Sequence, residues 1–177
     1  MESLSYTLLP SAFGSFRLAW QETEKGPKVH RVFFPHEQTP AGASSLSCPA
    51  IAEAGERILS FLEGEAVDFD LDMIALARCP EFQKRVLLAE YRIPRGWIST
   101  YGRIARHLGM PGGARAVGGA LARNPFPIVI PCHRAIRANS ELGGFRVGLE
   151  MKRALLELEG VEFSQTGKVL MDRIYYR

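Results

Sequence analysis

The feature that most limits the fold of this 177-residue chain is a change of hydrophobic pattern near Asp72. Before Asp72, three short runs rich in aromatic and aliphatic residues are separated by turn residues, which predicts strands at 5–9, 15–21 and 28–34. After it, apolar residues recur every three or four positions, as in amphipathic helices. A chain of this length forms one domain or two small ones. We therefore predict an α/β domain over residues 1–76, with a small antiparallel sheet and a helix, and a mostly helical domain over 77–177.

A helix and a fourth strand complete the predicted N-terminal domain. After a polar loop at 35–49, apolar residues at helical spacing predict a helix over 50–62 that ends at Gly64. The alternating run VDFDL predicts the fourth strand, at 67–71.

Two helices joined by a short turn stand out in the second half. One helix starts near Pro80 and ends before the IPRG turn at 93–96. Ser99 or Thr100 caps the next helix, which closes at Gly109, and a further helix follows at 114–123. This helix, turn and helix form the pattern of a helix-turn-helix. A strand-like apolar run at 128–130 and a last helix over 148–158 complete the prediction.

Composition and charge narrow the class of protein. With 46% apolar and 23% charged residues, the chain is neither disordered nor fibrous. The chain has three cysteines and no apolar run long enough to span a membrane. Its N-terminus has no basic stretch ahead of an apolar core, as a signal peptide would have. These features predict a cytoplasmic protein with free thiols. Residues 1–91 carry a net charge of −5 and residues 92–153 carry +9. The basic segment indicates a face that binds a polyanion such as nucleic acid, and the alternative is an ordinary solvated surface.

The predicted helix at 114–123 has an unusually bare face. Its core face carries Ala116, Val117, Ala120 and Leu121, and the opposite face carries Arg115, Gly118, Gly119 and Ala122. Each glycine costs roughly 1 kcal/mol relative to alanine in a helix, so the pair needs a reason. Close approach to a nucleic-acid groove and close packing against a neighbouring helix explain it equally well.

The segment PCHR places a thiol beside an imidazole. Cys132 follows the stiff apolar run PFPIVIP, so we expect it to be largely buried, and His133 follows directly. A thiol acts as a nucleophile only as the thiolate, which a neighbouring histidine can generate if a carboxylate orients its second nitrogen. The alternative is an inert core cysteine.

The sequences ISTYGRIARHLG, ARAVGGALARNPFPI and IPCHRAI together resemble the O6-alkylguanine-DNA alkyltransferases, from about Pro80 to Gly160. The resemblance implies a ribonuclease H-like N-terminal domain and a winged helix-turn-helix-like C-terminal domain. It also implies a stoichiometric, irreversible transfer of the alkyl group from O6-alkylguanine in DNA to Cys132, after the damaged base is flipped out of the helix. O4-alkylthymine is a second candidate lesion.

The resemblance assigns roles to individual residues. It implies that His133 is the base acting through a water, that Glu159 orients it, that Asn124 braces the active-site turn and that Tyr101 donates to N3 of the guanine. It implies that the helix at 114–123 lies in the minor groove and that its Arg115 fills the place in the base stack that the flipped base leaves. The implied DNA-binding residues are Tyr101, Ala114, Arg115, Gly118, Gly119, Ala122 and Arg123, and the implied base pocket consists of Leu121, Pro127, Ala135, Phe145 and Arg146.

Departures from the family pattern lie at two pocket positions. Many members have tyrosine where this chain has Phe145, and some have a small hydroxyl residue in place of Arg146. Some members hold a structural zinc, but His30, His36 and Cys48 lack the spacing of a zinc site, so we expect no metal and no cofactor. We expect a monomer that binds double-stranded DNA, with no membrane contact and no obligatory protein partner. It would be nucleoid-associated in a prokaryote and nuclear in a eukaryote.

Three other functions remain open at this point. One is a module that recognises alkylated bases without repairing them, although Cys132 argues against it. Another is a Cys-His hydrolase, which leaves the glycine-faced helix unexplained. The third is a helix-turn-helix regulator, which would need polar side chains for base reading on a helix that offers almost none. The last 17 residues lie outside the resemblance and have no predicted role.

Overall fold

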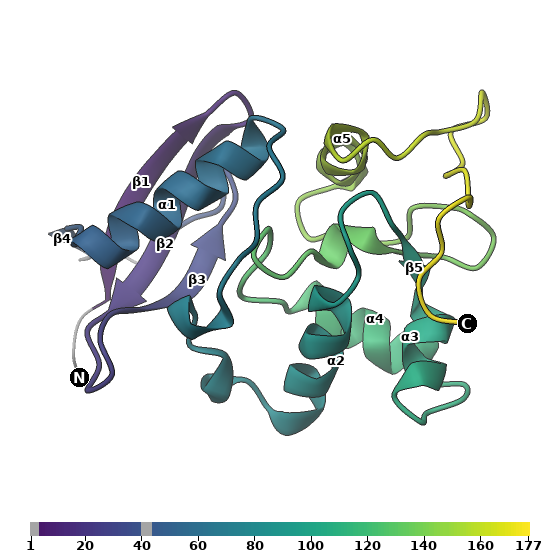
Figure 1. Ribbon diagram of the computed structural model, residues 1–177, viewed down its shortest axis with the longest axis horizontal. Coiled ribbons are helices and arrows are strands. Elements are labelled where there is room, and N and C mark those ends of the chain that lie inside the picture. Colours follow the sequence, from purple (N-terminus) through teal and green to yellow (C-terminus); the bar gives the residue numbers. More distant parts are fainter. Residues whose placement is uncertain (1–3, 40–43) are drawn as a thin grey trace. The chain divides into compact units, whose positions relative to one another are not determined.

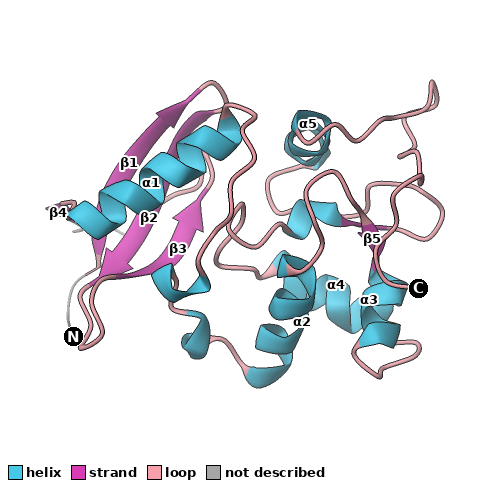
Figure 2. Ribbon diagram, in the orientation of Figure 1, coloured by secondary structure: helices cyan, strands magenta, loops and turns pink. Residues whose placement is uncertain are grey.

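The computed structural model describes residues 4–39 and 44–177 and divides the chain into two compact units, Met1–Arg78 and Cys79–Arg177. The first unit contains the sheet and one long helix, and the second is mostly helical (Figures 1 and 2). None of the helices in the described ranges has the length and apolar character needed to span a bilayer.

The sheet of the first unit has the strand order β3-β2-β1-β4. Strand β1 (Ser5–Ser11) pairs antiparallel with β2 (Gly14–Gln21), and β2 pairs antiparallel with β3 (Lys28–Phe33). The short β4 (Ser44–Ser45) lies parallel to β1 inside the segment that we predicted as a loop. Three of the four strands of the sheet, β1 to β3, are therefore strands that the sequence predicted.

Helix α1 (Pro49–Leu62) covers one face of this sheet (Figure 1). Its buried side includes Ile51, Ile58 and Phe61, the spacing that predicted the helix. Gly55 lies where a Cβ atom would come within 2.6 Å of the Leu9 side chain, so the helix backbone approaches β1 closely.

The predicted strand at 67–71 is wrong. Asp70 accepts a hydrogen bond from the Asp72 N–H at 2.8 Å and caps a 3-10 helix, η1 (Leu71–Met73). An aspartate that bonds the backbone two residues ahead forms a turn and competes with strand pairing. Phe69 is buried and packs against Phe61, so the central apolar residue of the run reaches the core without a strand.

The second unit begins with one α-helix that precedes the helix pair. After η2 (Leu76–Arg78) at the end of the first unit, α2 (Glu81–Tyr91) starts behind Pro80. Helices α3 (Tyr101–His107) and α4 (Ala114–Ala122) form the predicted pair, and the Thr100 hydroxyl caps α3 by accepting from Arg103 N–H at 3.2 Å. On α4, Val117, Ala120 and Leu121 are buried as predicted, but Ala116 is exposed. The core stripe of this nine-residue helix is narrower than the predicted face.

The predicted strand at 128–130 is also wrong. The three residues are buried, but Ile128 has a φ of +74°, and the segment turns instead of extending. A left-handed β-branched residue persists only where surrounding contacts hold it. Asn124 provides two such contacts, since its Oδ1 accepts from Phe126 N–H and its Nδ2 donates to the Ile130 carbonyl, both at 2.9 Å.

The rest of the second unit completes a small core around a two-stranded parallel sheet. Strand β5 (Ser99–Thr100) pairs with β6 (Ala135–Ile136), which follows the 3-10 helix η3 (Cys132–Arg134). Helix α5 (Leu149–Leu158) packs near η3, and Ile98, Ile136, Leu156, Val161 and Val169 form one apolar cluster.

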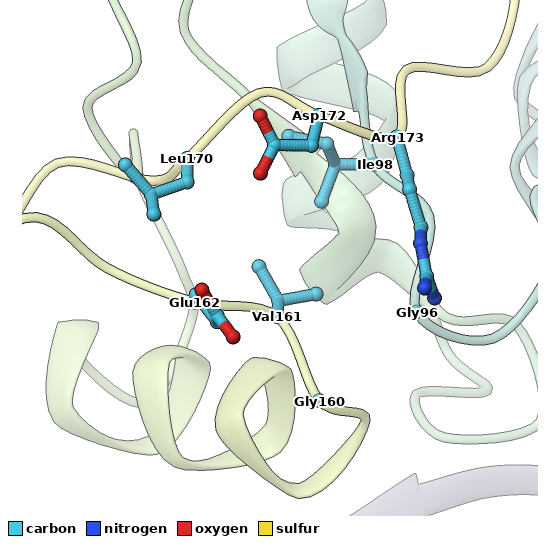
Figure 3. A pocket seen from close by; sticks show the side chains of 8 residues that line it. All are labelled: Gly96, Ile98, Gly160, Val161, Glu162, Leu170, Asp172 and Arg173. Carbon is cyan, nitrogen blue, oxygen red and sulfur yellow. The ribbon is translucent and has the colours of Figure 1, made fainter.

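The last residues of the chain are an ordered part of this unit. Tyr175 N–H donates to the Ile98 carbonyl at 2.7 Å and Ile98 N–H donates to the Arg173 carbonyl at 3.0 Å, so the tail runs beside β5. The Tyr176 ring stacks on His107, with 3.9 Å between centroids. Beside this segment lies a small pocket lined by Asp172 and Arg173 of the tail and by Gly96 and Gly160, in which the Arg173 side chain extends toward Gly96 (Figure 3).

Candidate active site

Cys132 is at the first position of η3 and is 8% exposed. Its N–H donates to the Ile130 carbonyl at 2.8 Å, so the turn that Asn124 braces also fixes the cysteine. Burial raises the pKa of the thiol to about 11, with a smaller opposing effect from a hydrogen bond to Asn124. Cys132 is therefore a thiol at neutral pH, and a reaction at its sulfur needs a base.

A buried carboxylate holds the neighbouring imidazole. His133 Nε2 lies 2.7 Å from Glu159 Oε1, and both side chains have no solvent exposure. Glu159 stands 26 residues further along, at the C-terminal end of α5. Burial lowers the pKa of His133, although Glu159 acts against this shift. With Nε2 on the carboxylate, Nδ1 is the ring nitrogen that can take up a thiol proton.

Arg134 completes the set of partners around Glu159. Its Nη2 donates to Glu159 Oε1 at 2.8 Å and its Nε donates to Oε2 at 2.9 Å, and the Gly96 N–H donates to Oε2 at 3.2 Å. Burial alone would raise the pKa of Glu159, but His133 and Arg134 outweigh it and hold that pKa at about 2. Glu159 is thus a permanent anion whose lone pairs are satisfied.

Tyr101, at the start of α3, meets the glycine-rich loop that follows β6. Its hydroxyl donates to the Gly144 carbonyl at 3.4 Å. Gly143 has a φ of +74°, and a Cβ atom there would lie 2.8 Å from the Tyr101 hydroxyl, so only glycine fits. Burial raises the pKa of Tyr101 to about 12, and the negative charges of Glu90 and Cys132 add to the shift, so Tyr101 keeps its proton at neutral pH.

Lys152 is a buried cation that sequence reasoning missed. It is 0% exposed, and its Nζ donates to the carbonyls of Ala135 and Leu142, each at 2.6 Å, and to the Tyr101 hydroxyl at 3.3 Å. Its Nζ also lies 5.9 Å from the centre of the Phe145 ring. The signal in the sequence is its spacing with Leu155, Leu156 and Glu159, which places a lysine on the core face of a helix.

The bare face of α4 is not explained by internal packing. A Cβ atom on Gly118 would lie 3.8 Å from the Tyr101 ring, and one on Gly119 would lie 3.6 Å from Arg123 Nη1, both ordinary contact distances. Arg115, Ala122 and Arg123 are exposed, and Ala114, Gly118 and Gly119 are half-buried. Of the two interpretations of the glycines, the geometry favours close approach by an outside body.

The pocket residues differ in burial. Of the residues predicted to line the base pocket, Leu121, Pro127 and Ala135 are buried, whereas Phe145 and Arg146 are half-buried. Arg146 Nη1 donates to the Asn124 carbonyl at 3.0 Å, and its charge lowers the pKa of Cys132. Over 4–39 and 44–177, no three histidine, cysteine or acidic side chains gather as a metal site.

Comparison with known proteins assigns this chain to a family. Residues 81–161 match the family described as 6-O-methylguanine DNA methyltransferase, DNA binding domain. A methylated-DNA–protein-cysteine methyltransferase of Methanosarcina acetivorans is 44% identical over 108 residues, which are 61% of this chain and 68% of that relative. The crystal structure of Mycobacterium tuberculosis OGT in complex with DNA has a TM-score of 0.77 and 35% identity, covering 88% of this chain and 92% of that one. The chain belongs to the methylated-DNA–protein-cysteine methyltransferase family.

Another member of the family shows how much of the chain the likeness covers. A methylated-DNA–protein-cysteine methyltransferase of Methanothermobacter thermautotrophicus is 47% identical over 112 residues, 63% of this chain. That alignment spans 62% of the relative's own length. The family model covers Cys132, His133, Glu159 and Tyr101, and it ends before the tail at 162–177. The resemblance to this family, read from the sequence motifs, is thereby confirmed.

Proposed function

We propose that this chain repairs alkylated DNA by moving the alkyl group of O6-alkylguanine onto its own Cys132, once per molecule. The observation that carries the proposal is the buried group of Cys132, His133, Glu159 and Arg134, in which a protonated thiol adjoins an imidazole held by a permanent carboxylate. The family membership and the OGT–DNA complex of a relative support DNA as the substrate.

The first half of the reaction is formation of the thiolate. The thiol proton passes to His133 Nδ1, directly or through a water, and Glu159 stabilises the imidazolium that results. The nearby Lys152 and Arg146 charges lower the pKa of Cys132, but burial outweighs them and leaves it at about 11, so the thiolate forms only with the help of the base. Asn124 acts as a positioning residue because it holds the turn that carries the sulfur.

The second half is the transfer itself. The sulfur attacks the alkyl carbon, a carbon–sulfur bond forms, and the carbon–oxygen bond to guanine O6 breaks. The guanine receives a proton at N3 from the Tyr101 hydroxyl, so it leaves as a neutral base instead of an anion. Tyr101 is then reprotonated from solvent and His133 releases the thiol proton to solvent, so the net reaction moves the thiol proton to the guanine. Leu121, Pro127, Ala135, Phe145 and Arg146 form the pocket for the flipped base, with Phe145 stacking on it. Because the product thioether is stable, each protein molecule reacts once. The reaction requires no cofactor.

The exposed face of α4 is the proposed DNA contact. Gly118 and Gly119 let the helix press into the minor groove, Ala114, Ala122 and Arg123 flank them, and Arg115 occupies the vacated stack. Flipping a base costs a few kcal/mol, less for a lesion that pairs badly, and the inserted arginine offsets part of this cost.

Finer features of the family belong to the same proposal. These are a ribonuclease H-like N-terminal domain at 1–76, a winged helix-turn-helix-like domain at 77–177, action as a monomer on double-stranded DNA, and a location in the cytoplasm, with the nucleoid or in the nucleus. O4-alkylthymine is the second lesion to test.

Intact-protein mass spectrometry tests the proposal. The protein is incubated with a duplex oligonucleotide that contains O6-methylguanine. We expect the mass of one methyl group to be added per molecule, on the peptide that contains Cys132, and no addition in Cys132→Ser.

Two outcomes would contradict the proposal. Binding of the duplex without any mass change would instead indicate a recognition module for alkylated bases. Repeated turnover, or label on Cys48 or Cys79, both half-buried free thiols, would exclude Cys132 as the acceptor.

A further inference from the structure

Glu90 is a second buried carboxyl group in the C-terminal unit, and the reaction above does not use it. It lies on α2 and is 0% exposed. Neither of its side-chain oxygens makes a hydrogen bond of normal geometry within the described residues. Leaving a buried carboxyl group without such partners is costly, and polar groups of this kind cluster at functional sites.

The groups around Glu90 are those of the active site. Its ionisation is favoured by Lys152 on α5, by Arg134 on η3 and by the Ala135 N–H, and is opposed by Glu159. In turn, an ionised Glu90 disfavours ionisation of Cys132 on η3, of Tyr101 on α3 and of Tyr176 in the tail. Helix α2, which carries Glu90, and helix α5, which carries Lys152, both pack against η3, which carries Cys132, so the three side chains belong to one packed region.

The supply of positive charge around Glu90 is limited. Arg134 is committed to Glu159 through three hydrogen bonds from its Nε and Nη2. Lys152 donates to the carbonyls of Ala135, Leu142 and Gly144, and three donated bonds require the ammonium form. No ion pair joins Lys152 to Glu90 within the described residues. Ala135 interacts with both side chains, because its carbonyl accepts from Lys152 and its N–H favours the ionised form of Glu90. Burial lowers the pKa of Lys152 to about 8, and an ionised Cys132 or Glu90 acts against this shift, so each of the two anions helps Lys152 to keep its charge.

We propose that Glu90 and Cys132 compete for the charge of Lys152, so that a protonated Glu90 favours the thiolate and an ionised Glu90 holds Cys132 as the thiol. Glu90 is in this sense a residue that tunes the nucleophile without touching the substrate. The effect of Glu90 on reactivity rests on the proposed alkyl transfer. The effect of Glu90 on the ionisation of Cys132 can be tested without DNA.

The effect of Glu90 on the ionisation of Cys132 depends on pH. Burial raises the pKa of Glu90 to about 8, so below neutral pH the group carries a proton and does not oppose the thiolate. Above that value it adds a negative charge beside the sulfur. Removing the carboxyl group should therefore make no difference at low pH and a growing difference as the pH rises.

Titration of the thiol by its ultraviolet absorbance tests the inference. The parent is the full chain with Cys48→Ser and Cys79→Ser, which leaves Cys132 as its one thiol. We compare Glu90→Gln and Glu90→Leu in this parent. Both variants should show a Cys132 pKa below that of the parent, with a thiolate fraction larger on the order of tenfold above pH 8, the scale of one nearby charge at intermediate dielectric.

A matched control removes a carboxylate from the surface of the same unit. Glu162→Gln, at an exposed position, should leave the Cys132 titration unchanged. If Glu90→Gln fails to fold, Glu90→Leu decides the result, because an apolar side chain in place of a buried unpaired carboxyl is tolerated or stabilising. Tyr101 titrates at high pH as well, so the spectra are also fitted at the wavelength of tyrosinate.

The rate of transfer from the O6-methylguanine duplex gives the second measurement. The transfer rate of the Glu90 variants divided by that of the parent should rise with pH. If Glu90 had only a structural role, this ratio would be the same at all pH values. Absence of transfer in every protein would contradict the proposed function but leave the thiol titration decisive. An unchanged or higher Cys132 pKa in the folded variants would overturn the inference.

Discussion

The two units of this chain bury different kinds of side chain. In the first unit, the buried side chains of residues 4–39 and 44–78 are aliphatic or aromatic, apart from one proline and one glycine. In the second, the buried set includes Glu90, Asn124, His133, Arg134, Lys152 and Glu159, together with Gln83, Ser99 and Thr100. The difference shows that the buried charged and polar groups of the described residues, including the candidate site, lie in the second unit.

Burial of charged groups is stabilising only when each is paired. Desolvation costs several kcal/mol per ion, and an apolar replacement is often as stable. Glu159 meets this requirement with three partners, but Glu90 does not. The buried charges of the second unit therefore cost stability, and substitutions there should change activity and stability by different amounts, whereas core substitutions in the first unit should change stability alone.

The largest effect is expected from breaking the His133–Glu159 pair. Loss of a general base costs on the order of 10²–10⁴ in rate. We expect His133→Ala to slow alkyl transfer by such a factor and Glu159→Gln by a similar one. The double variant should cost little more than either single one, because the two residues act as a unit.

Single-turnover transfer rates measure this cycle, with DNA affinity and urea unfolding as controls. Multiplied losses in the double variant would mean that the two residues act separately. A Glu159→Gln protein that unfolds more easily but transfers at the normal rate per folded molecule would assign Glu159 to the fold alone.

The next largest effect concerns the stability of the second unit. The pKa of Glu90 is raised to about 8, so the folded protein keeps a proton that the unfolded chain releases near pH 4.5. Unfolding then releases a proton between these values, and stability falls as the pH rises through them, by up to about 1.4 kcal/mol per pH unit. Glu90→Leu should lack this loss.

Urea unfolding of both proteins across this range checks the sign. The free energy of unfolding of Glu90→Leu minus that of the wild type should grow from about pH 4.5 to about pH 8 and then level off. A constant difference would mean that Glu90 is ionised throughout and is paired in solution.

The sequence predicted the architecture better than it predicted the charged core. Strands β1 to β3, helices α1 to α5 and the helix pair follow from local patterns of apolar, capping and turn residues. The failures at 67–71 and 128–130 occur where side chains of Asp70 and Asn124 bond to the backbone and override an apolar run. Glu90 and Lys152 were missed as functional groups, because their meaning depends on contacts between α2, η3 and α5 that no local pattern reveals.

A smaller effect is expected at the surface of the second unit. Arg115 is exposed, so Arg115→Ala should leave stability unchanged. It should slow transfer from duplex DNA on the order of tenfold and transfer from the free base much less, because only the duplex requires flipping. Arg57→Ala, at an exposed arginine on α1 of the first unit, is the matched control. Equal losses on both substrates would assign Arg115 to the chemistry or the fold.

The smallest effect on activity is expected in the core of the first unit. Ile58 on α1 is fully buried among apolar neighbours, and Ile58→Val removes one methylene group. Such a change costs about 0.5–1.5 kcal/mol of stability. Because the buried side chains of this unit include no group of the proposed reaction, the transfer rate per folded molecule should stay that of the wild type. Urea unfolding gives the first quantity, and single-turnover transfer under strongly native conditions gives the second. A rate that falls while the protein stays fully folded would mean that the apolar unit is coupled to the site, and the division of roles between the two units would not hold.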